Sequence, residues 1–367
     1  MTQFVGLDVS QKDTAVSVVD KEGRQMWRGK VKTDPTAIAD LIASRAPDAK
    51  RIGFETGPLS TWLWHALKDL GLPLICLDAR HAKAGLSVQV NKTDENDALG
   101  LAQLVRTGWY REVKVKSLDS HLVRGVLGAR AQLVSTRIHL TTTIRGLLKN
   151  VGVFVAVGHR QTFASAAEEA IGAQTGLAAM VAPLIAAWRA ITEQIRAYDG
   201  LLRRRAAHDE TTRRLMTVPG VGPIVALAFA SMVDEPGRFA KSKSVGAYLG
   251  LTPRRYQSGE KDVTSSISRT GDTLVRSYLF EAANVLMTRV KRWTGLKVWG
   301  VKLARRIGMN RARAAVARKM GVMMHKMLIT NTDFRWGKEE AVAGWSLLPT
   351  TSSASGGKMS LPGRSSW

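Results

Sequence analysis

The chain has 367 residues, of which 54 are Lys or Arg and 30 are Asp or Glu, so its formal net charge is +24. This length allows two or three domains, and such an excess of cations favours a polyanionic partner, such as nucleic acid, over a purely solubilising surface. The single cysteine, Cys76, excludes an internal disulfide framework and a Cys-rich zinc module. We find no signal peptide and no apolar run long enough to span a membrane, and we therefore expect no membrane partner.

The charge is unevenly distributed along the chain. Residues 1–110 hold 14 basic and 13 acidic side chains, whereas residues 241–326 hold 19 basic and 4 acidic ones. A solubilising surface does not require such one-sided charge. We therefore expect the C-terminal half to contact nucleic acid.

Residues 1–110 alternate between strand and helix patterns. Three strands come first, the second and third joined as a hairpin around Asp20–Gly23, and a helix–strand–helix–strand–helix series follows. The strands are expected at Phe4–Val9, Thr14–Val19, Gln25–Val31, Arg51–Glu55 and Pro73–Leu77, and the helices after Pro35, at Ser60–Leu70 and from about Thr93 to Arg106. This order is typical of an α/β domain of ribonuclease H type.

Residues 111–210 change to the pattern of long helices. Apolar residues recur at three- and four-residue steps from Leu118 to Leu147, and again from Leu184 to Leu202. Both segments indicate coiled-coil-like helices, packed on each other or on a second subunit.

Residues 211–335 are expected to form a mainly α-helical domain. Its VPGVGP run at 218–223 lies between two helical patterns and predicts a helix-hairpin-helix, in which Gly220 and Gly222 would let backbone N–H groups approach a phosphate. A plain glycine-turned helix pair is the alternative. The Ser-, Gly- and Thr-rich residues 346–367 are expected to be a disordered tail.

Four carboxylates stand out by position. Asp8 interrupts the apolar first strand, Glu55 ends another strand, and Asp94 and Asp97 share one face of a helix start. Strand ends of a parallel-type sheet converge beside a helix N-terminus, and four carboxylates gathered there repel one another unless divalent cations neutralise them. Mg²⁺ or Mn²⁺ would suit these oxygen ligands, and two such ions about 4 Å apart could hold both oxygens of a phosphodiester under attack.

Each acid by itself has a structural alternative, such as a strand end, a helix cap or a favourable position in the helix dipole. Sugar-kinase and actin-like folds also begin with a strand carrying such an aspartate. No second glycine-rich phosphate loop accompanies it here.

A second candidate site lies near residue 258. Arg254, Arg255 and Tyr256 stand close to Ser258 and the flexible Gly259, and a serine that attacks a phosphodiester needs cations for the developing charge. The structural alternative is an ordinary Ser-Gly turn. Three further serines, Ser265, Ser266 and Ser268, are rival nucleophiles.

Together these motifs resemble the insertion sequence 110 family of transposases, the DEDD-type, bridge-RNA-guided recombinases. The resemblance covers about residues 4–330 in the family's order and rests on GLDVS at 6–10, FETG at 54–57, KTDENDA at 92–98, VPGVGP at 218–223 and GLTPRRYQSG at 250–259. It implies a RuvC-like N-terminal domain, a coiled-coil middle and a C-terminal transposase domain that supplies a catalytic serine.

The resemblance further implies that Asp8, Glu55, Asp94 and Asp97 bind Mg²⁺, and that Ser258 forms a covalent 5′-phosphoserine link to DNA. The metal site and the serine would meet between subunits of a dimer or tetramer. The implied partners are donor DNA, target DNA and a non-coding bridge RNA, in the cytoplasm of a prokaryotic cell and at its nucleoid. From their charge, Arg254 and Arg255, with Tyr256 beside them, are expected to bind phosphate.

Two other functions remain open. A RuvC-like, metal-dependent DNA endonuclease would hydrolyse DNA with activated water and leave Ser258 structural. A non-enzymatic RNA- or DNA-binding protein would need none of the four carboxylates.

Overall fold

A five-stranded sheet occupies the N-terminal part of the chain in the computed structural model, which describes residues 2–87, 93–156, 162–259 and 261–336. The strand order is β3-β2-β1-β4-β5, with β1 antiparallel to β2, β2 antiparallel to β3, and β1, β4 and β5 parallel. The elements are β1 Gln3–Val9, β2 Asp13–Val19, β3 Gln25–Lys32, α1 Pro35–Arg45, β4 Ala49–Glu55, α2 Ser60–Asp69, β5 Leu74–Leu77, α3 Ala79–Leu86 and α4 Asp94–Thr107. This is the expected succession of elements, with α3 in addition, and the mixed sheet agrees with a ribonuclease H-like domain.

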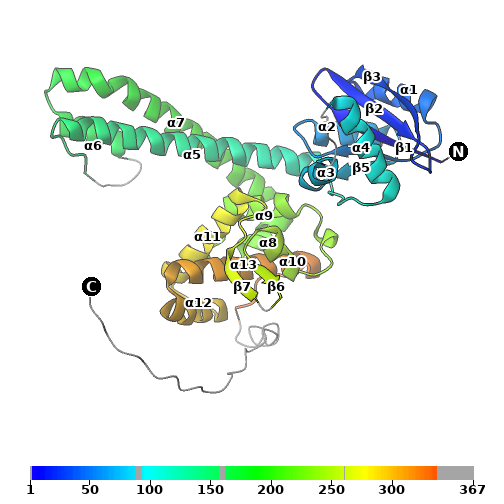
Figure 1. Ribbon diagram of the computed structural model, residues 1–367. Helices are drawn as coiled ribbons and strands as arrows, with labels where there is room; N and C mark the ends of the chain where they lie inside the picture. The colour runs from blue at the N-terminus through cyan, green and yellow to red at the C-terminus, as the bar shows by residue number, and fades with distance from the viewer. Residues whose placement is uncertain (1, 88–92, 157–161, 260, 337–367) are drawn as a thin grey trace, which may run out of the picture.

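Helices cover both faces of this sheet (Figure 1). On one face, Val5 and Leu7 of β1 pack with Ile52 and Phe54 of β4 against α1 and α2. On the other, Phe4 packs with residues of α4. Because side chains alternate along a strand, the even-numbered residues of β1 face α4, and Asp8 is one of them.

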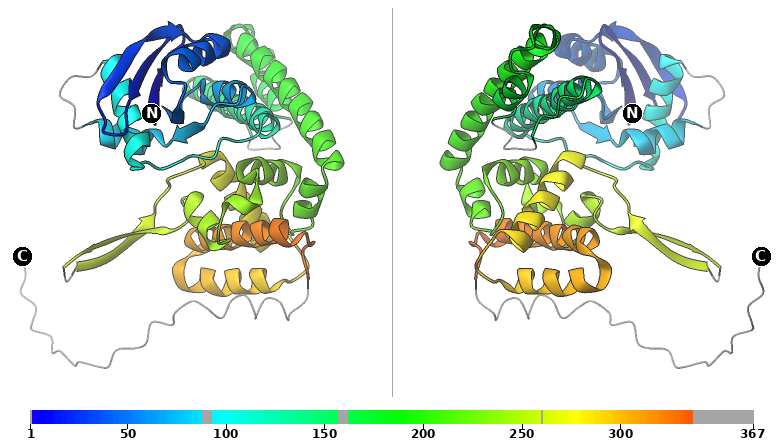
Figure 2. Two further views of the ribbon diagram at one scale, coloured as in Figure 1. Left: turned by 90° about the vertical axis from the view of Figure 1, so that its right-hand side faces the viewer. Right: turned by 90° about the vertical axis from the view of Figure 1, so that its left-hand side faces the viewer.

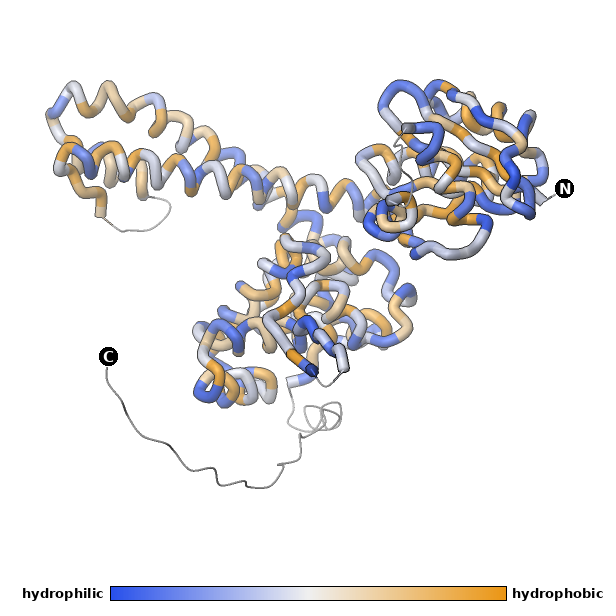
Figure 3. The backbone as a smooth tube through the Cα atoms, viewed as in Figure 1, coloured by the Kyte–Doolittle hydropathy of each residue, from blue (hydrophilic) through white to orange (hydrophobic). Residues whose placement is uncertain are grey.

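Two long helices extend away from the sheet domain (Figure 1). They are α5, Leu118–Asn150, and α7, Thr175–His208, with the short α6, Phe163–Ile171, between them. They pack on each other, with an Arg130–Asp199 ion pair at 2.6 Å and a Trp188–Thr141 hydrogen bond at 2.9 Å. Both alternate between hydrophilic and hydrophobic residues along their length (Figure 3).

Some apolar residues of α5 are not buried by the rest of the chain. Leu118 and Leu122 belong to the repeat that predicts the coiled coil, yet their side chains are 51% and 68% exposed. These positions leave open the packing of α5 on a second subunit. By length and composition α7 could cross a membrane, contrary to the expectation from the sequence, although one such helix is weak evidence. Of its apolar stretch 22% is buried, and α7 packs along α5.

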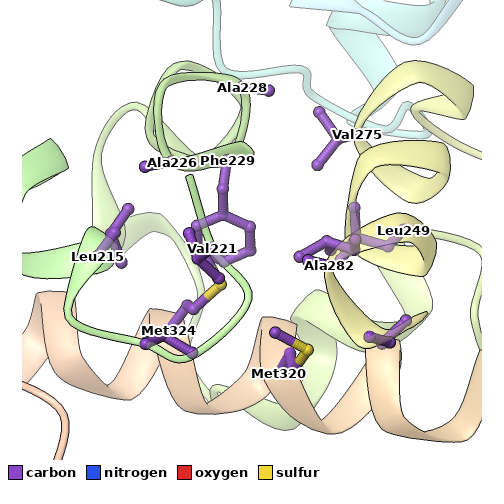
Figure 4. Close-up of a cluster of buried hydrophobic side chains, with 14 of the residues drawn as sticks. Leu215, Val221, Ala226, Ala228, Phe229, Leu249, Val275, Ala282, Met320 and Met324 are labelled. Atoms are coloured by element: carbon purple, nitrogen blue, oxygen red, sulfur yellow. The ribbon is translucent and has the colours of Figure 1, made fainter. Parts of the chain in front are cut away.

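The remaining described residues form a helical domain around one hydrophobic core. Its elements are α8 Glu210–Met216, α9 Pro223–Val233, the 3-10 turn η1 Pro236–Arg238, α10 Lys243–Tyr248, β6 Pro253–Ser258, β7 Lys261–Ile267, α11 Thr273–Thr288, α12 Gly295–Ile307 and α13 Met309–Thr330. Phe229 of α9 lies inside this core among residues of α11 and α13, such as Ala282 and Met324 (Figure 4). Leu127 of α5 and Leu202 of α7 join the same core, so the helical pair is anchored in this domain.

The β6–β7 hairpin departs from the mainly helical expectation for this region. Residues 254–267 lack an apolar repeat at helical spacing and contain Tyr256, Val263 and Thr264, which favour strands. Gly259, with φ of +55°, follows β6 in the left-handed region that glycine adopts without strain. The hairpin projects away from the helices (Figure 2).

The segment before α5 joins the sheet domain to the helical domain. Ser117 donates its N–H and hydroxyl to the Asp234 carboxylate, at 3.0 and 2.6 Å, and Lys114 pairs with Glu235. These contacts tie residues 114–117 to the end of α9. The expected boundaries at 110/111 and 210/211 lie near the ends of α4 and α7, and the division into three units stays our proposal; residues 346–367 lie outside the described residues.

Candidate active site and nucleic-acid groove

Asp8 and Glu55 lie side by side at the carboxyl ends of two neighbouring parallel strands. Leu7 of β1 is in register with Phe54 of β4, so the next residue on each strand, Asp8 and Glu55, continues the same pairing. Both are half-buried. Gly6 and Gly53, two residues earlier, face α4, and the two carboxylates therefore point to the face that α4 covers.

Helix α4 begins at the same edge of the sheet. A Cβ on Gly6 would lie 2.0 Å from the Ala98 carbonyl oxygen, so the glycine allows the first turns of α4 to lie directly on β1. The helix is capped by Thr93, whose hydroxyl accepts from the Asn96 N–H, and Asp94 and Asp97 lie in its first turn. Acidic side chains are favourable at this positive end of the helix dipole.

Asp94 already interacts with a cation from the sheet. Lys30 of β3 donates to its carboxylate at 3.0 Å, and this hydrogen bond, with the Asp94 charge, raises the pKa of Lys30. Lys30 lies in the same cross-strand row as Asp8, since Ala15 of β2 is in register with both. Asp94 is thus held toward β3, two strands from Asp8.

The four acids share an edge without forming a closed ligand cluster. Within the described ranges, no three Asp, Glu, His or Cys side chains stand close enough together to hold a metal ion. The donor set nevertheless fits a hard divalent cation, because it consists of carboxylates and one of them attracts Lys30. Binding such an ion would require these side chains to move toward one another.

Ser258 is the last residue of β6, exposed at the tip of the projecting hairpin (Figure 2). The hairpin belongs to the helical domain, whereas the carboxylates belong to the sheet domain (Figure 1). A single chain in this conformation does not bring the serine and the acids together.

The three residues expected to bind phosphate beside Ser258 have different surroundings. Arg255 makes a two-bond pair with Asp262, at 2.8 and 2.6 Å, which raises the pKa of Arg255 and lowers that of Asp262. Arg254 donates to the Ser268 carbonyl oxygen at the base of the hairpin. Tyr256 is 66% exposed. Side chains of Tyr256 and Ser258 share one face of β6, and Arg255 lies on the other.

Packing alone requires a glycine at position 220, and its contact with phosphate stays a prediction. Its φ is +90°, and an added Cβ would lie 2.6 Å from the Ala282 carbonyl oxygen of α11. Gly222 has no atom within 4 Å of its Cβ position and precedes Pro223 at the start of α9. Of the two glycines, Gly222 is the one whose surroundings leave room for a ligand, and its binding role stays a prediction.

A groove of about 1690 Å³ opens on the helical domain between β6, β7, α10, α11, α12 and α13. Cationic side chains line it, together with the aromatic rings of Trp299, Phe334 and Trp336 and one acid, Asp333. The cations are Lys243, Arg269, Arg276, Arg311, Arg318, Lys319, Lys326 and Arg335. Positive charge combined with aromatic rings suits a nucleic-acid strand.

Two family models match this chain. Residues 5–153 match a model described as Transposase and labelled for the DEDD transposases of IS110, and residues 212–298 match one described as Transposase IS116/IS110/IS902 family. The first match covers the domain that carries the four acids, and the second covers the hairpin that carries Ser258. The chain belongs to the IS110 family of transposases.

Relatives of similar length support this assignment of the transposase. The transposase for insertion sequence element IS1111A of Coxiella burnetii is 28% identical over 344 residues, 91% of this chain and 92% of that one. The transposase for insertion sequence element IS1328 of Yersinia enterocolitica is 28% identical over 320 residues, 86% of this chain and 94% of that one. As a transposase, the protein acts on DNA, and its DEDD carboxylates indicate dependence on a divalent metal.

A solved structure of Thermus thermophilus RuvC aligns with 30% of the transposase and 99% of its own chain, at 15% identity and a TM-score of 0.25. The ribonuclease H-like assignment of the sheet domain rests instead on its strand order and element succession.

Sequence reasoning missed the groove as a site of the transposase, although it expected a basic C-terminal half. Trp299 had no expected role, yet it lines the groove with Lys319 3.6 Å above its ring. A signal was present in α13, where Arg311, Arg318 and Lys326 recur at seven- and eight-residue steps on one helical face.

Proposed function

We propose that this transposase cuts and rejoins DNA with Ser258 as nucleophile, assisted by Mg²⁺ held between Asp8, Glu55, Asp94 and Asp97. The observation that carries the proposal is the sheet edge at which Asp8 and Glu55 follow the paired residues Leu7 and Phe54, beside the first turn of α4. Bound there, the metal would neutralise the carboxylates and the charge on a phosphodiester. Mn²⁺ is the expected substitute.

In the reaction, the Ser258 Oγ–P bond forms as the P–O3′ bond breaks. The serine loses its proton and the released 3′-oxygen gains one, which leaves a 5′-phosphoserine. Reversal with another 3′-hydroxyl rejoins strands without hydrolysis, so no ATP is needed. The flexible Gly259 beside Ser258 gives the hairpin tip freedom to reach the phosphate.

The separation of the two half-sites favours action between subunits. Ser258 ends the β6 strand of the helical domain, whereas the carboxylates lie in the sheet domain, and the two domains stand apart (Figure 1). We infer that Ser258 of one subunit meets the acids of another in a dimer or tetramer. The exposed Leu118 and Leu122 of α5 offer apolar surface for such an assembly.

Nucleic acid would lie along the basic groove of the helical domain. The proposed ligands are donor DNA, target DNA and a guide RNA transcribed from the non-coding flank of the element. Further contacts outside the groove would come from Arg254, Arg255, Tyr256, Gly220 and Gly222. We place the protein in the bacterial cytoplasm, at the nucleoid when it is bound to DNA.

The test is covalent trapping. Purified protein is incubated with labelled element-end DNA, Mg²⁺ and RNA from the element's flank, and denaturant-resistant protein–DNA adducts are measured. We expect an adduct with the wild-type protein and none with Ser258→Ala or Asp8→Ala alone. Mixing these two variants should restore adduct, because an intact serine can then meet intact acids across subunits.

Two results would contradict the proposal. Cleavage that leaves no adduct and survives Ser258→Ala would establish the alternative, a hydrolytic RuvC-like endonuclease. Failure of the mixed variants, with an active wild-type protein, would place serine and acids in one subunit.

A further inference from the structure

A lysine stands directly across the hairpin from the proposed nucleophile. Ser258, the last residue of β6, is in register with Lys261, the first residue of β7. Side chains of an antiparallel pair project to the same face, with Cβ atoms about 4.5–5.5 Å apart. The Lys261 ammonium group therefore stays close to the Ser258 hydroxyl in any position of the hairpin.

The two faces of the hairpin differ in charge. Arg255, Gln257, Asp262 and Thr264 share the face opposite Ser258, where Arg255 and Asp262 neutralise each other through two hydrogen bonds. On the face of Ser258, Lys261 lies beside Tyr256 and Val263, which are paired with each other. Lys261 is exposed, and it makes no ion pair with another residue of the described ranges. Because Lys261 is exposed, its ammonium group is accessible to an incoming phosphate.

We propose that Lys261 is a catalytic residue that binds a non-bridging oxygen of the phosphodiester attacked by Ser258. This inference rests on the proposed serine mechanism and adds a residue to it. As the Oγ–P bond forms and the P–O3′ bond breaks, negative charge builds up on the non-bridging oxygens. The ammonium group donates a hydrogen bond to that charge and holds the 5′-phosphoserine afterwards.

The chemistry of this step assigns Lys261 an electrostatic role rather than that of a general base. An ammonium ion is a donor with no free lone pair, and its proton stays on nitrogen throughout. Arginine also carries a permanent charge and donor groups but cannot act as a base. Lys261→Arg therefore separates the two roles, because it keeps the charge and removes the basic nitrogen.

The experiment measures the single-turnover rate of adduct formation at saturating protein, with Mg²⁺, labelled element-end DNA and flank RNA. Loss of one donor to a developing oxyanion lowers a rate about 10²- to 10³-fold. We therefore expect the rate of adduct formation by Lys261→Gln to be at least about 100-fold below that of the wild-type protein. Lys261→Arg should retain most of the rate. DNA affinity should change little, since one phosphate contact among many is lost.

Two controls isolate the effect. Lys68→Gln removes one charge from an exposed lysine at the end of α2 and should react at the wild-type rate. Gln257→Ala alters the opposite face of the hairpin next to Ser258 and should keep the hairpin intact. A slow Lys261→Gln beside two normal controls would exclude a general charge effect or a collapsed hairpin.

The outcomes separate the two levels of the argument. Adduct formation by Lys261→Gln at the wild-type rate would overturn the role of Lys261 and leave the serine mechanism standing. Loss of the rate in Lys261→Arg as complete as in Lys261→Gln would overturn its electrostatic role. Cleavage by the wild-type protein without any adduct would refute the serine mechanism, and the role of Lys261 with it.

Discussion

Substituting Gly6 by alanine should displace the helix that carries two of the four acids. The new Cβ would lie 2.0 Å from the Ala98 carbonyl oxygen and 2.4 Å from the Ala102 nitrogen, whereas real Cβ contacts stay above 3.0 Å. Helix α4 would therefore have to move by at least about 1 Å, since both obstacles are backbone atoms of one rigid helix. Overpacking of this kind lowers the free energy of unfolding by about 1–3 kcal/mol. Because the contact is with rigid backbone atoms, we expect Gly6→Ala near the upper end of this range.

A loss of about 3 kcal/mol corresponds to a fall in Tm of about 12 °C for a domain of roughly 100 residues. Thermal unfolding followed by circular dichroism gives the Tm, and hydrogen–deuterium exchange of peptides from β1 and β4 locates the loosened part. The matched control is Gly125→Ala in α5, where no atom lies within 4 Å of the added Cβ. That change should stabilise its helix by about 0.8–1 kcal/mol.

A Tm of Gly6→Ala within about 1–2 °C of the wild-type value, with unchanged exchange protection of β1, would refute this prediction. In that case the close approach of α4 to β1 would not be what holds the first turn of α4, which carries Asp97, at this edge of the sheet.

Two further predictions concern titrating groups. Burial lowers the pKa of Lys319 to about 8, so the groove should lose a positive charge as pH rises from 7 to 9 and bind nucleic acid more weakly. Affinities measured at constant salt over this pH range should fall further in the wild-type protein than in Lys319→Met. The pKa of Asp234 is lowered, because hydrogen bonds from Ser117 and Ser120 outweigh the opposing effect of burial. The ionised carboxylate stabilises the fold at pH values above the pKa of Asp234 in the unfolded chain, and this stabilisation is lost as pH falls through its pKa in the folded protein. Asp234→Asn should therefore lower the free energy of unfolding, measured with urea, by about 1–2 kcal/mol at pH 7 and by much less in acid. A difference that does not depend on pH would contradict this assignment.

Much of the sheet domain could be predicted because its signals are local. Alternating apolar residues mark β1 and β2, the Asp20–Gly23 turn joins β2 to β3, and Asp34 with Pro35 starts α1. The Asp34 side chain accepts from the Ala37 N–H, as expected for a helix cap. Each of these features depends on neighbours within a few residues.

The hairpin of Ser258 shows where local reasoning ends. The sequence marks Arg254, Arg255 and Ser258 as a group, but strand pairing puts Arg255 and Ser258 on opposite faces and sets Lys261 against the serine. Gly220 gives a similar lesson, because its contact with Ala282 joins segments about 60 positions apart. Neither arrangement follows from spacing along the chain.

The sequence by itself determined the family motifs, the division of charge between the two halves and the succession of strands and helices in the first domain, because these depend on residue identity and on short-range periodicity. Only the tertiary structure decided that Asp8 and Glu55 follow paired residues on neighbouring strands, that Asp94 pairs with Lys30, and that the basic groove collects side chains from six separate elements. These relations are set by how helices and sheets pack, which depends on contacts between residues far apart in the chain.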